Sequence, residues 1–248
     1  MLTIKNPAEL VKMRKAGYIV AEVLALMSEL VKPGITTKDL DIAAEKLIRN
    51  RGARPLFLGY GGFPASICAS VNEQVVHGIP GDRVLKAGDI ISIDVGAEIG
   101  GYCGDAARTF AVGEIDSEIR RLLKVTELSL EKGIEMAVNK NRLGDIAHNV
   151  QKVVEDAGFS VVRDYTGHGI GKHMHEDPAV PNYGRAGCGM RLVNGMTLAI
   201  EPMVNMGTHK VITLSDGWTV VTKDLKPSAH FENTVAITPQ GPQIMTIL

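Results

Sequence analysis

The chain has 248 residues, of which 45% are hydrophobic and 22% are charged, as is ordinary for a globular enzyme. A formal net charge of −1 excludes the basic field typical of proteins that bind nucleic acid or an anionic membrane surface. The three cysteines are far apart and form no Cys-x-x-Cys pair, so free thiols in a reducing, cytoplasmic compartment are expected. Neither a signal peptide nor a membrane-spanning apolar run is recognisable.

Two helices are predicted in the first part of the chain. Asn6 provides a cap, Pro7 occupies the first helical position and Glu9 the third, which is typical of a helix start. Apolar residues then recur at mostly helical spacing as far as Val31. After a Pro-Gly turn, Thr36 is expected to cap a second helix that ends near Gly52.

A strand and a hairpin follow. Asp94 is predicted to end the strand, and Gly100-Gly101 is typical of a two-residue hairpin turn. If Ile99 pairs with Tyr102, Asp105 lies on the same face as Asp94, displaced diagonally by two residues. Diagonal neighbours are about 7–8 Å apart at the backbone, so both carboxylates would reach metal ions about 3.5–4 Å apart.

The second part of the chain resembles the first. A helix is predicted from Ser117 to about Val138 and another from about Asp145 to Gly158. Residues 85–94 and 192–201 both read Leu-x-x-Gly, then alternating apolar residues, then an acid. This repeat makes Glu201, which is 107 residues after Asp94, its equivalent. It predicts a single α+β domain, residues 1–248, whose halves of about 1–113 and 114–248 share one sheet.

Four acids and one histidine are candidate metal ligands. A pseudo-twofold axis that relates the two halves is expected to bring Asp94 and Asp105 together with Glu201 and Glu232. Glu232 is predicted to open a returning strand. Four buried acids would repel one another unless cations such as two divalent ions neutralised them. His168 lies in Gly-His-Gly-Ile-Gly, where glycines permit close approach and imidazole is a common metal ligand.

Four further histidines differ in their sequence contexts. His175 is placed as a second polar group beside the metal site, whereas His173 is expected to be exposed. His77, before a glycine, is the other candidate, although such a residue is more often part of a turn. His230 shares a strand face with Glu232 and is either a partner of a ligand or a partly exposed strand residue.

The ordered motifs Ser-Val-Asn-Glu…His-Gly-Ile-Pro, Ser-Ile-Asp-Val-Gly, Gly-Asp, Gly-His-Gly-Ile-Gly…His-Glu-Asp-Pro, Ile-Glu-Pro and Phe-Glu-Asn-Thr cover essentially the whole chain. In this order they closely resemble the methionine aminopeptidases, in their short bacterial type I form. The resemblance implies the pita-bread fold, with two pseudo-symmetric halves around a central curved antiparallel sheet. It also implies a monomeric enzyme that removes initiator methionine from nascent polypeptides with a small second residue, near the ribosome.

The resemblance also implies roles for the candidate residues. Asp105 and Glu232 would bridge two divalent ions (Co, Mn, Fe or Zn), Asp94 would hold one of them, and His168 with Glu201 the other. Metal charge would lower the pKa of a bridging water. Glu201 would carry its proton to the leaving amine, His175 would donate to the carbonyl oxygen and His77 would orient the amide.

A methionine pocket is implied by the same match. Its lining is expected to be Phe57, Tyr60, Phe63, Cys68, Met174 and Trp218. The chain departs from many relatives at Gly61 and Cys103, where histidine is common, and from some at Phe57, where cysteine occurs. These departures leave the pocket width and the oxidation sensitivity beside Asp105 open.

Three rival interpretations share part of this pattern. A proline-directed (Xaa-Pro) aminopeptidase shares the ligand order, but usually has an additional N-terminal domain for which the 93 residues before Asp94 leave no room. A type II relative would have a helical insertion between Glu201 and Glu232, which are too close for it. A non-catalytic pita-bread binding module would have lost ligands, whereas all five are present.

Overall fold

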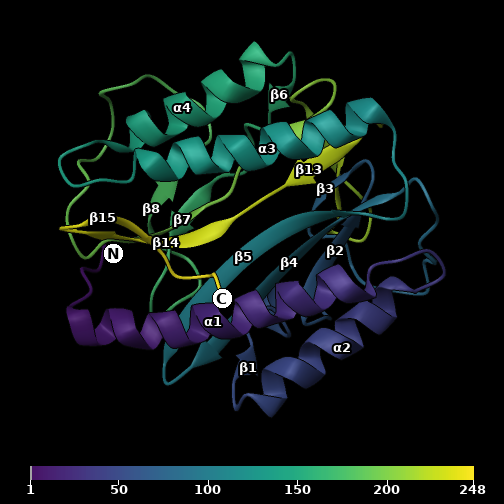
Figure 1. The fold of residues 1–248 in the computed structure, drawn as a ribbon, viewed down its shortest axis with the longest axis horizontal. Helices are drawn as coiled ribbons and strands as arrows, with labels where there is room; N and C mark the ends of the chain where they lie inside the picture. The colour runs from purple at the N-terminus through teal and green to yellow at the C-terminus, as the bar shows by residue number, and fades with distance from the viewer. Residues whose placement is uncertain (1) are drawn as a thin grey trace.

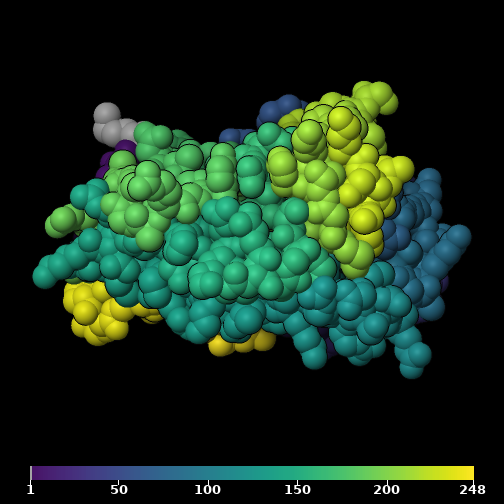
Figure 2. Space-filling model, turned by 90° about the horizontal axis from the view of Figure 1, so that it is seen from above, coloured from purple at the N-terminus to yellow at the C-terminus, as the bar shows by residue number. Residues whose placement is uncertain are grey.

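Two pairs of helices cover opposite sides of a set of antiparallel strands (Figure 1). The computed structural model describes residues 2–248. The helices on one side are α1 (Pro7–Leu30) and α2 (Thr37–Asn50). Those on the other side are α3 (Ser117–Glu135) and α4 (Leu143–Asp156). Figure 2 views the face on which residues of α3 and α4 cover the middle.

The predicted helix starts are confirmed where capping signals mark them. Asn6 and Glu9 form a reciprocal capping box at α1, and Thr36 with Asp39 forms another at α2. Asp116 caps α3 one residue before the expected start at Ser117. The prediction that α3 extends to about Val138 is wrong by three residues, since the helix ends at Glu135.

The strands of residues 2–248 form four antiparallel sheets. In the first half, a short 3₁₀ turn covers Tyr60–Gly62, and the strands are β1 (Arg54–Pro55), β2 (Ile67–Val71), β3 (Gln74–Val76), β4 (Ile90–Ile99) and β5 (Tyr102–Ala111). The strands of the second half are β6 (Ser160–Val161), β7 (Gly167–Gly169), β8 (Glu176–Val180), β9 (Thr197–Ile200), β10 (Met203–Asn205), β11 (Val211–Thr213), β12 (Val220–Thr222), β13 (Ser228–His230), β14 (Asn233–Thr238) and β15 (Gly241–Ile244).

Each half has a hydrophobic core of its own. In the first half, aliphatic residues of α1 and α2 pack against β2 and β4; fully buried examples are Val20, Leu40 and Ile93. In the second half, residues of α3 and α4 pack against β9 and β14, with Leu122, Ile146 and Leu198 fully buried. The α+β class is therefore as predicted, whereas the strands of residues 2–248 pair in four sheets and not in the one shared sheet that was expected. None of the helices within residues 2–248 is long and apolar enough to cross a membrane.

Candidate metal centre

The β4–β5 hairpin positions the first two acids. Its turn is Gly100-Gly101, both with positive φ, and Ile99 pairs with Tyr102 as predicted. In this register Asp105 lies opposite Gly96, two residues from Asp94 on the same face. The expectation that Asp94 ends a strand is wrong: it lies inside the ten-residue strand β4, because hairpin pairing continues to the turn.

Glu201 and Glu232 lie at the ends of two paired strands of the second half. Glu201 follows β9 and Glu232 precedes β14, where the pairing of Ile200 with Asn233 sets them side by side. The two halves join where the Glu232 N–H donates to the Ala107 carbonyl at 2.9 Å. The four acids from both halves thus line one cavity.

Two threonines show how the pseudo-twofold axis relates the halves. The Thr234 hydroxyl accepts from the Asp105 N–H at 3.1 Å and donates to the Asp105 carbonyl at 2.8 Å. The Thr109 hydroxyl makes the same two bonds with His230, at 2.8 and 2.9 Å. Thr109 is four residues after Asp105, and Thr234 is four residues after His230. His230 is therefore the symmetric equivalent of Asp105. Glu232 therefore occupies the place of Ala107, a pairing that the ten-residue repeat did not reveal.

His168 reaches the acids from β7. Its Nδ1 donates to the Gly169 carbonyl at 2.9 Å, which leaves Nε2 as the unprotonated nitrogen. Nε2 is 3.6 Å from Glu201 Oε1 and 4.0 Å from Asp105 Oδ2. Burial, with a smaller contribution from His175, lowers the pKa of His168 to about 4. The ring is consequently neutral near pH 7, the form that coordinates metals.

Three other histidines surround the cluster. The His175 ring is 4.4 Å from that of His168, and its Nδ1 is 2.7 Å from Tyr60 Oη. His77 has a φ of 59°, and its ring contacts Trp218. Burial lowers the pKa values of His77, to about 4, and of His175. His230 is buried with Nε2 3.7 Å from Glu201 Oε2, so the partly exposed alternative for His230 is wrong.

Burial raises the pKa values of all four carboxyl groups and so disfavours their simultaneous ionisation. It raises the pKa of Asp94 to about 7 and that of Glu201 to about 8. For Asp105 and Glu232, burial and then repulsion by neighbouring acids raise the pKa values well above the ordinary range. Nearby positive charge is limited, because the Arg108 guanidinium donates to the Glu232 backbone carbonyl rather than to its carboxylate.

The donor atoms fit a hard or borderline divalent cation. Three buried carboxylate oxygens have no hydrogen-bond partner within residues 2–248: Asp94 Oδ1, Asp105 Oδ1 and Glu232 Oε1. Donor atoms of Asp105, His168 and Glu232 all lie within 4.8 Å of one another. Unpaired buried oxygens are rare in proteins, and an oxygen-rich set with one imidazole suits Mn(II), Fe(II), Co(II) or Zn(II).

An apolar wall adjoins this cluster in a cavity of about 150 Å³. All the residues that the sequence predicted for a side-chain pocket line it: Phe57, Tyr60, Phe63, Cys68, Met174 and Trp218. Phe63 and Trp218 meet edge to face with ring centroids 5.2 Å apart. The cavity thus places apolar surface directly beside the carboxylates, and His77 and His175 also line it.

The departures at Gly61 and Cys103 have clear local consequences. A Cβ at Gly61 would be 3.3 Å from the Trp218 ring, so glycine keeps this approach open. Cys103 is buried, and burial raises its thiol pKa to about 12. Because the thiolate is the reactive form, oxidation of Cys103 beside Asp105 is disfavoured. The three cysteines are free thiols, as predicted.

Three residues that support the site were not predicted from the sequence. Thr109 and Thr234 join the halves, and Asn182 donates to the Glu201 carbonyl at 3.0 Å. The equal spacing of the threonines after Asp105 and His230 is visible in the sequence, but the hydrogen bonds that relate the two halves are not, and Asn182 has no sequence signal.

Comparison with known proteins gives consistent results. The model of metallopeptidase family M24 matches residues 11–239. The methionine aminopeptidase of Clostridium acetobutylicum is 60% identical over 248 residues, covering 100% of this chain and 99% of that protein. The crystal structure of methionine aminopeptidase from Rickettsia prowazekii is 44% identical, with a TM-score of 0.98 and 100% of both chains covered.

A more distant structure shares the fold alone. The X-Pro aminopeptidase from Thermotoga maritima is 22% identical with a TM-score of 0.77, and the match covers 99% of this chain but 62% of that one. The similarity to solved structures confirms the predicted pita-bread fold.

Proposed function

Because the chain belongs to the methionine aminopeptidases of metallopeptidase family M24, we propose that it removes the initiator methionine from nascent polypeptides whose second residue is small. The observation that supports this most directly is the single cavity in which an apolar wall adjoins four carboxylates and three imidazoles. Such a cavity can bind an apolar side chain and perform hydrolysis at the bond next to it.

Two divalent ions, of Co, Mn, Fe or Zn, are proposed as cofactors. The residues that would hold them are Asp94, Asp105, His168, Glu201 and Glu232. The three unpaired carboxylate oxygens and the neutral His168 ring support this assignment. When bound, such ions lower the pKa of a coordinated water and polarise a carbonyl.

The remaining chemistry is proposed for three side chains. Glu201, whose pKa burial raises to about 8, is suited to accept a proton and pass it to the leaving amine. His175, held by Tyr60, would donate to the carbonyl oxygen as negative charge develops. His77, whose ring contacts Trp218 in the same cavity, would orient the amide.

Methionine selection is assigned to the apolar wall. We predict that Trp218→Ala raises KM for Met-Gly-Ser about tenfold with a smaller change in kcat, because the ring supplies binding to substrate and transition state alike. Trp218→Phe, which keeps an aromatic contact with Phe63, should remain close to the parent. Steady-state kinetics with both variants tests this. An unchanged KM in Trp218→Ala would remove Trp218 from the pocket.

The proposed reaction is tested by release of free methionine from Met-Gly-Ser and Met-Leu-Ser by metal-loaded protein, with and without chelator. Rapid, chelator-sensitive release from Met-Gly-Ser and slow release from Met-Leu-Ser are expected. Intact Met-Gly-Ser would refute the proposal, and preferential cleavage of Xaa-Pro peptides would instead support the proline-directed alternative.

The setting of the reaction is also part of the proposal. The enzyme would be a single catalytic domain that works as a monomer. A cytoplasmic location near the ribosome would give access to new N-termini, and three free thiols suit a reducing compartment.

A further inference from the structure

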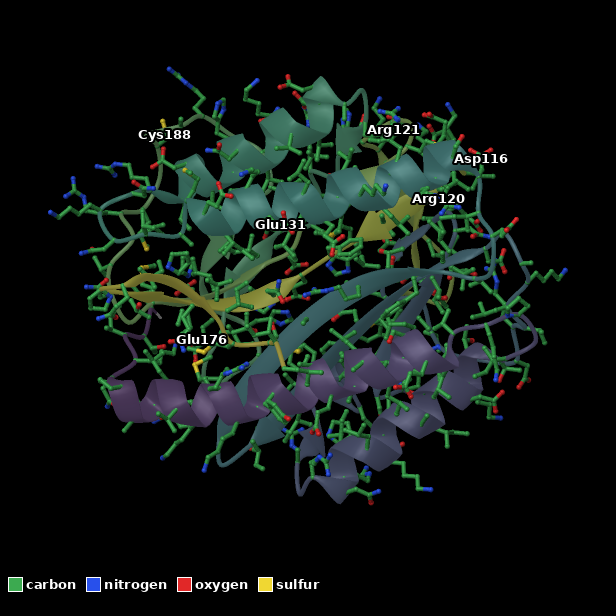
Figure 3. All side chains as sticks on the ribbon, viewed as in Figure 1. Asp116, Arg120, Arg121, Glu131, Glu176 and Cys188 are labelled. Carbon is green, nitrogen blue, oxygen red and sulfur yellow. The ribbon has the colours of Figure 1, made fainter. Side chains whose placement is uncertain are left out.

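A buried ion pair joins the N-terminal segment to the turn that carries His175. Lys5 Nζ is 2.7 Å from Glu176 Oε2, and both side chains are only 5% exposed. The Thr3 hydroxyl donates to the same carboxylate oxygen. Figure 3 labels Glu176 beside the N-terminal part of α1, away from the helices α3 and α4. Glu176 is not one of the acids assigned to the metal centre.

The other oxygen of Glu176 holds the turn itself. Oε1 accepts the backbone N–H of Lys172 at 2.9 Å and that of His173 at 3.2 Å. These residues directly precede Met174, which lines the apolar wall, and His175, which faces His168. One carboxylate thus anchors the backbone on which both functional side chains sit.

Lys5 is itself fixed from the opposite side. The backbone N–H of Lys5 donates to the Gly195 carbonyl at 2.8 Å. A Cβ at Gly195 would lie 2.6 Å from the Lys5 carbonyl oxygen. Gly195 leads into β9, which ends beside Glu201. The segment around Lys5 is therefore packed between the turn that carries His175 and the start of β9, the strand that Glu201 follows.

We propose that Glu176 is a positioning residue that sets the location of His175, and that Lys5 supplies the charge that keeps the Glu176 carboxylate in this buried place. The inference rests on the proposed function for its kinetic consequence. A carboxylate buried without a partner would be strongly disfavoured, whereas the ammonium and the three hydrogen-bond donors satisfy it. Hydrogen-bond acceptance from the turn, rather than charge, is what holds His175.

Two uncharged double variants separate these contributions. Lys5→Met with Glu176→Gln retains an oxygen that can accept from the turn, whereas Lys5→Met with Glu176→Met does not. Replacement of a buried ion pair by neutral groups of similar volume is often tolerated, so both are suitable for comparison. Lys152→Met with Asp156→Asn is the matched control, because this ion pair is 60% and 64% exposed on α4.

The Gln-containing variant is expected to have a kcat for Met-Gly-Ser close to the parent and the control. The Met-containing variant should have a kcat lower by on the order of 10- to 100-fold, with KM within about threefold, because displacement of His175 removes a transition-state contact. Glu176→Gln alone should lose activity that the added Lys5→Met restores.

A measurement independent of turnover separates this inference from the proposed function. In ¹⁵N-histidine NMR spectra of the metal-free proteins, the His175 ring signals should shift in the Met-containing variant, while those of His148 on α4 stay unchanged. Calorimetric metal affinity should be alike in both double variants. Equal kcat values and equal His175 signals in the two would overturn the positioning role. Inactivity of the parent would refute the proposed function alone.

Discussion

Glu201→Gln is expected to lower kcat for Met-Gly-Ser by on the order of 10²- to 10⁴-fold, the range typical of a lost general acid–base. The substitution removes a ligand charge and the carboxylate proposed to carry the proton. Burial raises the pKa of Glu201 to about 8, so the carboxyl can exchange a proton near neutral pH, which an amide cannot do. His168 and His230 contact different oxygens of Glu201, so in the glutamine variant one of the two histidines would face the amide nitrogen in place of an oxygen.

Steady-state kinetics at saturating metal measures this effect, and calorimetry establishes whether metal still binds. Glu114→Gln, an exposed substitution that changes net charge equally, serves as the control. If Glu201→Gln retained turnover within about threefold of the control, its proton-transfer role would be excluded.

Metal removal is expected to abolish turnover and to destabilise the protein increasingly as pH rises. The folded-state pKa of Asp94 is raised to about 7 and that of Glu201 to about 8, above their unfolded values. Such groups stabilise the fold fully below the unfolded pKa, and this contribution is lost as pH rises through the folded pKa. Each buried acid can change the unfolding free energy by about 1.4 kcal/mol per pH unit within that window.

The buried histidines determine the lowest pH at which the effect of the carboxyl groups on stability can be measured separately. Burial lowers the pKa values of His77 and His168 to about 4, so their opposing effect on stability acts below pH 6.5. Between pH 6.5 and 8.5 the unfolding free energy of the metal-free protein should therefore fall by a few kcal/mol in total.

Denaturant unfolding across this range, with chelator or with saturating metal, checks the expectation. The metal-bound protein should lose less stability, because cations compensate the ionised carboxylates and metal binding releases protons. A metal-free stability that rose from pH 6.5 to 8.5 would contradict the raised pKa values.

Much of the fold was predictable from local sequence. The capping boxes at Asn6 and Thr36 marked two helix starts because they require particular side chains at a spacing of three residues. Gly100-Gly101 fixed the register that places Asp105 diagonally from Asp94, since both turn positions need positive φ. Helix ends were less predictable: no comparable signal marked the end of α3 at Glu135.

The sequence by itself predicted the five candidate metal ligands and the apolar pocket residues and, through the hairpin, the relation between Asp94 and Asp105. Only the tertiary structure decided that His230 is the symmetric equivalent of Asp105 and that Glu176 is bound to Lys5. Caps and turns depend on backbone angles within a few residues, so their signals are local. Lys5 and Glu176 are 171 residues apart in the sequence. Their pairing depends on burial, because a charged group that is removed from water needs a partner of opposite charge. Only the packing of the two halves decides which group that is.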